Sequence, residues 1–378
     1  MAASARPRLL LAIPHLGGGG AERVTALLAQ ELSRERYGLH LAVVTQTQAE
    51  LAPPPPGLEV HALGALRVRT GAWELLRLVR KLKPDLILSG MAHLNFLVLM
   101  LRPLFPRKTR VLVRQNSTAS AALEFGGLPS CTRAFYRLLY RRADRVICQT
   151  AAMSADLATQ LRVPRARIVV LPNPVDLDAI RACVQEPCAR RRWPAPDSPG
   201  PHLLAVGRLS KEKGFDLLLE ALAVVRRSFA GADLILCGAG PEEASLKSLG
   251  ARLGLANCIQ FAGHVADPAV FFQRASAFVL SSRHEGMPNA LLEAAAAGIP
   301  IVALPSSQGV IDLLRDRQGA WLAREISATA LADSMGTALR AFRHGERFAH
   351  PWVEQFGLRR ALAAYEELID AVLRQKRQ

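Results

Sequence analysis

Short hydrophobic runs of about five residues alternate along most of the chain with longer segments in which apolar residues recur every three or four positions. The short runs are typical of buried strands, and the longer period is that of helices packed by one face. Their regular alternation predicts parallel sheets covered by crossover helices. The first strand is expected at 8–13, followed by a glycine loop at 17–20 and a helix from Ala21 to Arg34.

The expected strands form two series. Further strands of the first series are predicted near 39–45, 58–62, 85–89, 109–113, 144–148 and 167–170, and those of the second near 202–206, 232–236, 258–262, 276–280 and 299–303. Between the series, residues 187–201 contain five prolines, which disfavour a helix or strand interior. The sequence therefore predicts an α/β protein of two doubly wound domains, 1–186 and 202–352, with a linker at 187–201. An amphipathic C-terminal helix at 353–378 is expected to pack back across the first domain.

Composition fits a large folded protein of 378 residues, because 50% of them are hydrophobic and 21% are charged, which excludes disorder of the low-hydrophobicity type. The apolar run Leu9–Ile13 is too short for a secretory signal. The longest apolar stretch, Leu86–Leu101, contains His93 and Asn95, so we expect a strand and a buried helix there and no membrane span. Six scattered cysteines without a Cys-x-x-Cys pair predict neither a disulfide framework nor a zinc site. We expect a cytoplasmic protein, or one peripheral on the cytoplasmic face of a membrane.

A glycine-bearing loop joins a strand to a helix at two places, 9–29 and 202–222. Glycine lets backbone amides approach a ligand, and the helix N-terminus that follows favours negative charge, so both loops predict anion sites at the carboxyl ends of their sheets. In the second loop, Arg208 and Lys213 together suit a diphosphate. Glu22 and Glu243 stand where a dinucleotide-binding fingerprint needs its third glycine, which disfavours an NAD-dependent dehydrogenase.

Residues 281–300, SSRHEGMPNALLEAAAAGIP, form the most informative segment. Pro288 suits the first turn of a helix that ends at Gly298, just before the next strand. Glu285 precedes this helix and Glu293 lies inside it, among apolar neighbours that make a solvated surface role a poor explanation. Two carboxylates beside free helix amides suit sugar hydroxyls next to an anionic diphosphate, and the competing interpretation is the acid and base of a hydrolase.

These motifs together resemble those of glycosyltransferase family 4, which has the GT-B fold. The resemblance rests on the Glu-x7-Glu spacing of Glu285 and Glu293, on Gly207-Arg208 with Lys213-Gly214, and on Gly-Gly-Gly-Ala-Glu-Arg at 18–23. The motifs occur in the family's order and span nearly the whole chain. The resemblance implies two Rossmann-like domains facing a cleft, and retaining transfer of a sugar from a nucleotide sugar without a metal or another cofactor.

The resemblance also implies roles for individual residues. Arg208 and Lys213 would contact the donor diphosphate, and Glu285 would bind sugar hydroxyls, these three forming the catalytic set. Glu293 would accept hydrogen bonds from the ribose, and Val265 would lie against the base. The other donor-binding positions are in the glycine loops and at the helix start: Gly18, Gly19, Gly20, Gly207, Gly286, Met287, Pro288, Asn289 and Ala290. The charge developing on the departing diphosphate would be stabilised electrostatically.

One position departs from the family pattern. After the strand expected at 109–113, many family members carry a histidine near the reacting sugar, whereas this chain has Asn116 in that segment. An amide can orient a hydroxyl but cannot act as an acid or base. His93 is a second candidate for a sugar or acceptor contact, and a structural histidine in the core is the alternative for it.

Charge is unevenly divided, since residues 1–175 hold 24 basic and 10 acidic side chains and residues 176–378 hold 24 and 22. In the first half, Arg133, Arg137 and Arg141 recur every four residues on an expected helix beside aromatic and leucine side chains. Such a stripe suits an anionic membrane surface or a phosphate-bearing acceptor, and a solvated helix face is the alternative. Nucleic acid is disfavoured, because no known binding module occurs.

The sequence therefore predicts a glycosyltransferase that moves a hexose or N-acetylhexosamine from a nucleotide sugar, for which UDP is preferred, to a lipid-linked or envelope glycan with retention of configuration. Two alternatives share the fold: an inactive protein that binds nucleotide sugars, and a GT-B nucleotide-sugar epimerase.

Overall fold

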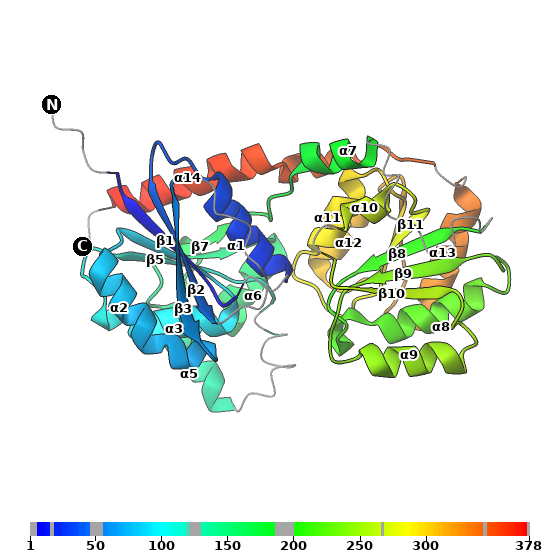
Figure 1. The fold of residues 1–378 in the computed structure, drawn as a ribbon, viewed down its shortest axis with the longest axis horizontal. Coiled ribbons are helices and arrows are strands. Elements are labelled where there is room, and N and C mark those ends of the chain that lie inside the picture. Colours follow the sequence, from blue (N-terminus) through cyan, green and yellow to red (C-terminus); the bar gives the residue numbers. More distant parts are fainter. Residues whose placement is uncertain are drawn as a thin grey trace. The chain divides into compact units, whose positions relative to one another are not determined.

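The computed structural model describes residues 6–15, 19–45, 56–118, 120, 130–185, 200–265, 268–342 and 346–375, without the side chains of residues 130–133. Strands and helices alternate along the chain (Figure 1). The fold divides into two units, which we call unit 1 (Met1–Pro174 with Arg359–Gln378) and unit 2 (Val175–Leu358).

Unit 1 contains a parallel sheet in the order β3-β2-β1-β4-β5-β6-β7. The first six positions follow the strand order of doubly wound dinucleotide-binding folds. The strands are β1 (Arg8–Ile13), β2 (Gly38–Thr45), β3 (Leu58–Ala65), β4 (Leu86–Gly90), β5 (Arg110–Arg114), β6 (Arg145–Cys148) and β7 (Ile168–Val170). The helices are α1 (Gly20–Glu31), η1 (Val68–Gly71), α2 (Ala72–Leu82), α3 (Ala92–Leu101), η2 (Arg102–Leu104), α5 (Ser130–Tyr140), α6 (Ala151–Gln160), η3 (Arg165–Arg167) and α14 (Leu358–Arg374).

The sheet of unit 1 is buried on both faces. Successive side chains of β1 alternate between two cores, since Leu10 and Ala12 belong to one hydrophobic cluster and Leu9, Leu11 and Ile13 to the other. Strands covered by helices on both faces need such continuous apolar runs, which is why β1 and β4 are visible in the sequence as unbroken hydrophobic segments.

The C-terminal helix α14 belongs to unit 1. Its residues Tyr365, Ile369 and Val372 are buried in the same cluster as β1, and Tyr37 donates a hydrogen bond of 2.6 Å to Asp370 Oδ1. Arg36 forms ion pairs with Glu366 and Asp370. The expectation that the last helix returns to the first domain is confirmed.

Unit 2 contains a second parallel sheet in the order β10-β9-β8-β11-β12-β13. Its strands are β8 (His202–Val206), β9 (Asp233–Cys237), β10 (Ile259–Gly263), β11 (Ala277–Leu280), β12 (Ile301–Ala303) and β13 (Ala320–Leu322). Its helices are α7 (Leu177–Gln185), η4 (Lys211–Lys213), α8 (Phe215–Val225), α9 (Glu243–Arg252), α10 (Ala269–Phe272), α11 (Asn289–Ala296), α12 (Gln308–Leu314), α13 (Ala328–Ala341) and η5 (Pro351–Phe356). The predicted pair of doubly wound sheets is confirmed.

Some details differ from the sequence-based expectation. The units divide between Pro174 and Val175, because Leu177 and Ile180 of α7 are buried in the core of unit 2, whereas the sequence assigned them to the first domain. Strand β13 was not expected. Leu86–Leu101 forms β4 and the ten-residue helix α3, as expected. In the described ranges, no helix combines the length and apolarity that crossing a bilayer requires.

Candidate active site

The second glycine loop lies against the segment that follows β11 in unit 2. Strands β8 and β11 are neighbours, with Leu204 paired to Phe278, so the loops at their carboxyl ends meet. Gly214 has a φ of 61°, and a Cβ at this position would lie 2.1 Å from the carbonyl oxygen of Ser281. Only glycine permits this approach, which explains why Lys213-Gly214 accompanies the segment that begins at Ser281.

Lys213 and Glu285 form an ion pair at this junction. The Lys213 Nζ lies 2.6 Å from Glu285 Oε1, and the Ser282 hydroxyl donates to the same oxygen at 2.6 Å. The Glu285 side chain is 9% exposed and that of Lys213 is 25% exposed. A buried carboxylate with two donors is well compensated, and it fixes the ammonium at the carboxyl edge of the sheet.

A second ion pair, between Arg283 and Asp216, holds the loop after β8. Arg283 donates to both carboxylate oxygens of Asp216, at 2.7 and 2.6 Å, and to the carbonyl oxygen of Lys211 at 2.9 Å. The hydrogen bond from Arg283 holds the pKa of Asp216 below its usual value. This forked contact ties η4 and α8 to the β11 segment.

Helix α11 begins at Asn289, with Pro288 as its N-cap residue and not within its first turn. The Pro288 carbonyl oxygen accepts from Leu291 N at 3.2 Å and from Leu292 N at 3.3 Å. The first turn of a helix carries backbone N–H groups without intrahelical partners and a partial positive charge. Gly286 is buried, while Met287, Ala290 and Glu293 are half-buried.

The other residues expected on the donor side follow β8 and β10, two strands of the same sheet. Arg208 is exposed directly after the half-buried Gly207, which follows β8, and Val265, which follows β10, is half-buried against the core. Close packing explains Gly238 and Gly240. A Cβ on Gly238 would lie 1.8 Å from the carbonyl oxygen of Gly207, and a Cβ on Gly240 would lie 2.3 Å from that of Leu209. The glycines at 238 and 240 therefore allow close backbone contact with the loop that follows β8.

In unit 1, the first glycine loop surrounds a buried carboxylate. Glu22, in the first turn of α1, is 2% exposed, and its Oε1 lies 3.5 Å from the Nε2 of His15. A Cβ on Gly19 would lie 2.2 Å from Glu22 Oε2, so this glycine leaves room for the carboxylate. Gly20 begins α1, whereas Gly18 lies outside the described residues.

His93 follows β4 at the same carboxyl edge and is exposed, so it is not a core histidine. Surrounding protein atoms lower its pKa, and the nearby Glu22 carboxylate opposes this shift. Asn116 accepts a hydrogen bond from Arg114, the last residue of β5. Arg114 is 1% exposed and also donates to Asn173 and, at 3.1 Å, to the Tyr365 hydroxyl of α14. The amide oxygen of Asn116 is thus engaged by a buried guanidinium.

The expected arginine stripe is divided in the structure. The side chain of Arg133 lies outside the described residues, and Arg137 donates to the Gln160 carbonyl oxygen at 3.0 Å. Arg141 is exposed and lines a pocket of about 820 Å³ at the amino ends of β5, β6 and β7. We call this pocket the arginine groove. Its basic residues are Arg102, Arg107, Arg110, Arg141, Arg142, Arg145 and Arg167.

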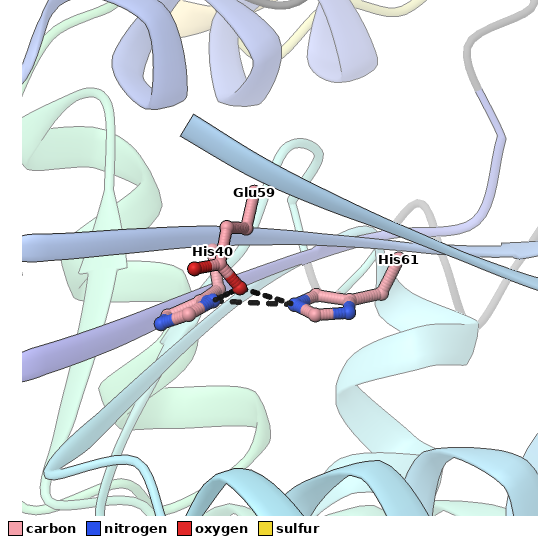
Figure 2. Close-up of side chains that lie close together, drawn as sticks. All are labelled: His40, Glu59 and His61. Atoms are coloured by element: carbon pink, nitrogen blue, oxygen red, sulfur yellow. Dashed lines mark hydrogen bonds and ion pairs between the residues drawn. The ribbon is translucent and has the colours of Figure 1, made fainter. Parts of the chain in front are cut away.

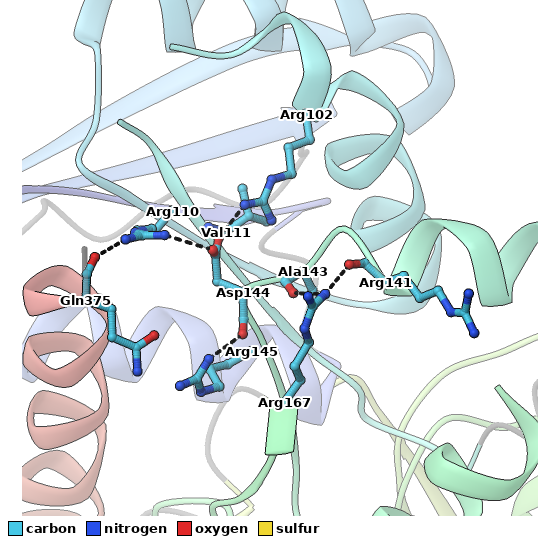
Figure 3. A network of polar contacts seen from close by, with 9 residues as sticks. All are labelled: Arg102, Arg110, Val111, Arg141, Ala143, Asp144, Arg145, Arg167 and Gln375. Atoms are coloured by element: carbon cyan, nitrogen blue, oxygen red, sulfur yellow. Dashed lines mark hydrogen bonds and ion pairs between the residues drawn. The ribbon is translucent and has the colours of Figure 1, made fainter. Parts of the chain in front are cut away.

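A single carboxylate lies among these arginines (Figure 3). Asp144 contacts Arg102 at 2.7 Å and Arg110 at 3.3 Å. Other guanidinium groups are oriented by backbone carbonyl oxygens: Arg145 donates to Asp144 O at 2.8 Å, and Arg167 donates to Arg141 O. Seven cationic side chains with one acidic partner leave a large excess of positive charge in the groove.

Fold and site together define a class: a GT-B glycosyltransferase that uses a nucleotide sugar. The family described as Glycosyltransferase Family 4 matches residues 18–179, and that described as Glycosyl transferases group 1 matches residues 200–341. The chain belongs to the group 1 glycosyltransferases of family 4. This identification confirms the resemblance noted in the sequence.

Several characterised and uncharacterised proteins are similar to this chain. An N-acetylgalactosamine-N,N'-diacetylbacillosaminyl-diphospho-undecaprenol 4-alpha-N-acetylgalactosaminyltransferase of Campylobacter jejuni is 25% identical over 88% of this chain and 90% of that protein. The lipopolysaccharide core biosynthesis glycosyltransferase LpsE of Rhizobium meliloti is 28% identical over 94% and 97%. An uncharacterized glycosyltransferase of Methanocaldococcus jannaschii is 24% identical over 67% of this chain and 63% of its own length.

Among solved structures, HepE of Anabaena in complex with UDP-glucose is similar in fold. The TM-score between the two structures is 0.78 and their sequences are 16% identical, and the match covers 96% of this chain and 99% of that chain.

Two features of the site were not expected from the sequence. Glu22 breaks a dinucleotide fingerprint and belongs to the Gly-Gly-Gly-Ala-Glu-Arg motif, but neither pattern predicts its burial beside His15. The second feature is the buried Arg114, since nothing in the sequence indicates that Tyr365 would accept its hydrogen bond.

Proposed function

We propose that the chain transfers a hexose or N-acetylhexosamine from a UDP-sugar to a lipid-linked or envelope glycan, with retention of the anomeric configuration. The observation that carries the proposal is the half-buried Lys213–Glu285 pair at the carboxyl edge of unit 2, beside the start of α11. It supplies a fixed cation, a carboxylate and helix amides at one place, which are the groups that a sugar diphosphate needs.

In this proposal Lys213 and Arg208 bind the donor diphosphate, and the N-terminus of α11 faces it. Glu285 both holds the Lys213 ammonium and accepts from sugar hydroxyls, while Glu293 accepts from the ribose. Negative charge grows on the diphosphate as the glycosidic bond to it breaks, so these groups stabilise the transition state more than the ground state. The leaving phosphate takes the acceptor proton, and no protein nucleophile is required.

We assign the acceptor side to the carboxyl edge of unit 1. Glu22 is a buried carboxylate with His15 at 3.5 Å, and His93 is close enough for the Glu22 charge to act on its pKa. Such a carboxylate can orient an acceptor hydroxyl by accepting its hydrogen bond. Because the amide oxygen of Asn116 accepts a hydrogen bond from Arg114, we assign Asn116 a positioning role that acts through Arg114.

Names of similar proteins support the choice of substrates. The Campylobacter protein is named for an acceptor linked to diphospho-undecaprenol, and LpsE is named for the lipopolysaccharide core. HepE was solved with UDP-glucose. We therefore propose a UDP-sugar as donor and an acceptor attached to a lipid diphosphate or to an envelope glycan.

The arginine groove is proposed to bind anionic lipid headgroups. It lies at the amino ends of β5 and β6, and a five-residue strand is about 16 Å long, so it is a different surface from the carboxyl edge where we place the reaction. Leu104 is 49% exposed beside the groove-lining Arg102 and Pro103, and Leu138 of α5 is 55% exposed. Exposed apolar side chains near cationic ones are typical of proteins that adsorb to anionic membranes.

The first test is a thermal-shift screen of the purified chain with UDP-, GDP- and ADP-sugars. A ligand that binds only the folded state raises its apparent stability with the logarithm of ligand concentration over the dissociation constant. We expect UDP-sugars to give the largest shift. Transfer is then measured with a glycan on diphospho-undecaprenol as acceptor, and the anomeric configuration of the product is determined by NMR. A larger shift with GDP- or ADP-sugars contradicts the proposed donor, and an inverted product contradicts retention.

A further inference from the structure

Two histidines and a glutamate converge on the edge of the unit 1 sheet, in a region that the transferase chemistry does not use. His40 lies on β2, and Glu59 and His61 lie on the edge strand β3 (Figure 2). The parallel register pairs His40 with Glu59 and places His61 two residues further along the same strand. Alternate residues of a strand share a face, so the three side chains are directed to one side of the sheet.

The ligand atoms of these side chains lie close together. His40 Nδ1 is 3.2 Å from His61 Nε2 and 3.2 Å from Glu59 Oε2, and His61 Nε2 is 4.0 Å from the same oxygen. In a tetrahedral zinc site with bonds of about 2.0–2.1 Å, neighbouring ligand atoms are about 3.3 Å apart. Two of the three separations already match this value. The Glu59 side chain is 71% exposed, so a small rotation of it can shorten the third.

The two histidines are held by burial and by ring stacking. His40 is 7% exposed within the sheet, and the rings of His40 and His61 are stacked with centroids 5.4 Å apart. The basic residue closest in the register, Arg8, pairs with Gly38 and directs its guanidinium to the carbonyl oxygen of Leu82 at 2.7 Å. No other group of three such ligands occurs in the part of the chain that the structure describes.

We propose that His40, Glu59 and His61 bind a divalent transition-metal ion, with Zn²⁺ as the expected species. The ligand atoms are His40 Nδ1, His61 Nε2 and Glu59 Oε2, and a water completes the tetrahedron on the solvent side. Two imidazoles and one carboxylate are ligands that zinc, copper and nickel accept. The ion takes the place of the proton that lies between the two imidazole nitrogens. The ring that held this proton changes to its other neutral tautomer, so both histidines bind as neutral imidazoles.

The ion would cross-link edge strand β3 to β2 and so oppose the separation of β3 from the sheet. It has no part in sugar transfer, so this inference stands or falls separately from the proposed function. We expect donor and acceptor turnover to be the same in the metal-free and zinc-loaded protein.

The test uses the full chain without a histidine tag, stripped with a chelator and titrated with zinc sulfate in competition with a chromophoric chelator. We expect one ion per chain for the wild type and at least about tenfold weaker binding for His61→Ala and Glu59→Gln. His264→Ala, which removes an exposed histidine of unit 2, is the matched control and is expected to bind like the wild type.

A second readout separates binding at this site from loss of folding. Cobalt(II) added to the stripped wild type should give the visible absorption of a tetrahedral nitrogen and oxygen site, and His61→Ala should not give it although its metal-free melting temperature is close to that of the wild type. Equal zinc affinity of wild type and His61→Ala, or no binding by the wild type at about 100 µM zinc, would overturn the proposal.

Discussion

Unit 2 contains 19 basic and 19 acidic side chains, whereas unit 1 contains 29 and 13, so the entire formal net charge of +16 belongs to unit 1. The difference is also one of arrangement. In unit 2 two ion pairs join the loop after β8 to the segment after β11, Lys213 with Glu285 and Arg283 with Asp216. In unit 1 seven arginines gather around Asp144 in the arginine groove.

Paired and unpaired charge serve different purposes. A charge held by a buried partner has a fixed position, which is what a transition state requires. An excess of one sign produces a field that attracts an anionic surface without fixing its orientation, and salt screens this field. We therefore expect variants in unit 2 to affect the chemical step, and variants in the groove to affect where the enzyme binds.

The largest effect is expected for Glu285→Ala. The substitution removes the proposed sugar contact and leaves the Lys213 ammonium without its carboxylate partner. Transfer should fall about a hundredfold or more, as is common when one preorganised group is lost. Glu325→Ala, an exposed glutamate of the same unit, is the control. If the folded Glu285→Ala protein transfers sugar about as fast as the wild type, Glu285 does not belong to the active site.

Glu22→Gln tests whether the carboxyl edge of unit 1 binds the acceptor. The amide keeps the shape of the side chain but removes the charge that faces His15. We expect transfer to the acceptor to fall about tenfold, in the range of a positioned polar group, while slow hydrolysis of the donor is unchanged. Glu31→Gln lies on the same helix, is exposed and serves as control. Equal losses of transfer and hydrolysis would indicate instead a disturbance of the whole enzyme.

The arginine groove is tested by Arg107→Ala combined with Arg141→Ala, because both side chains are exposed. Sedimentation with vesicles containing anionic phospholipid should fall severalfold at low salt, since each removed cation weakens the attraction to such a surface. Arg77→Ala with Arg80→Ala removes the same charge from exposed positions of α2 and should have a smaller effect. Equal losses for the two pairs would show that net charge matters and that the groove does not.

Asp216→Asn should give the smallest effect, and one that depends on pH. Arg283 lowers the pKa of Asp216 in the folded protein, so the carboxylate stabilises the fold above its unfolded value of 3.8 and loses this effect as pH falls through the lower folded value. Both side chains are partly exposed, so solvent screening limits the difference to at most about 1 kcal/mol. Thermal unfolding should show the variant less stable at pH 7, and this difference should shrink as the pH falls from 3.8 through the lower folded pKa of Asp216.

Local sequence patterns were sufficient to predict much of the fold. Strands such as β1 and β8 are buried on both faces and are therefore continuous apolar runs. Such runs can be recognised in the sequence without knowing which strands lie beside them. The division at Val175 was missed, because α7 is assigned by the core it packs against, and strand β13 was missed as well.

The candidate site was partly predictable for a related reason. Lys213-Gly214 and the segment 281–300 are continuous motifs, and the structure joins them because β8 and β11 are adjacent. The arginine groove and the cluster of His40, Glu59 and His61 draw residues from separate segments with no fixed spacing. Only the order and register of the strands bring such residues together.

The most direct test of the central claim is calorimetric titration of the purified chain with UDP. If unit 2 binds the donor through Lys213 and Glu293, Lys213→Ala and Glu293→Ala should each weaken binding at least about tenfold, in line with the loss of a hydrogen bond to a charged group. Lys211→Ala, an exposed lysine of the same loop, should bind UDP like the wild type. Wild-type affinity in both folded variants would contradict the account.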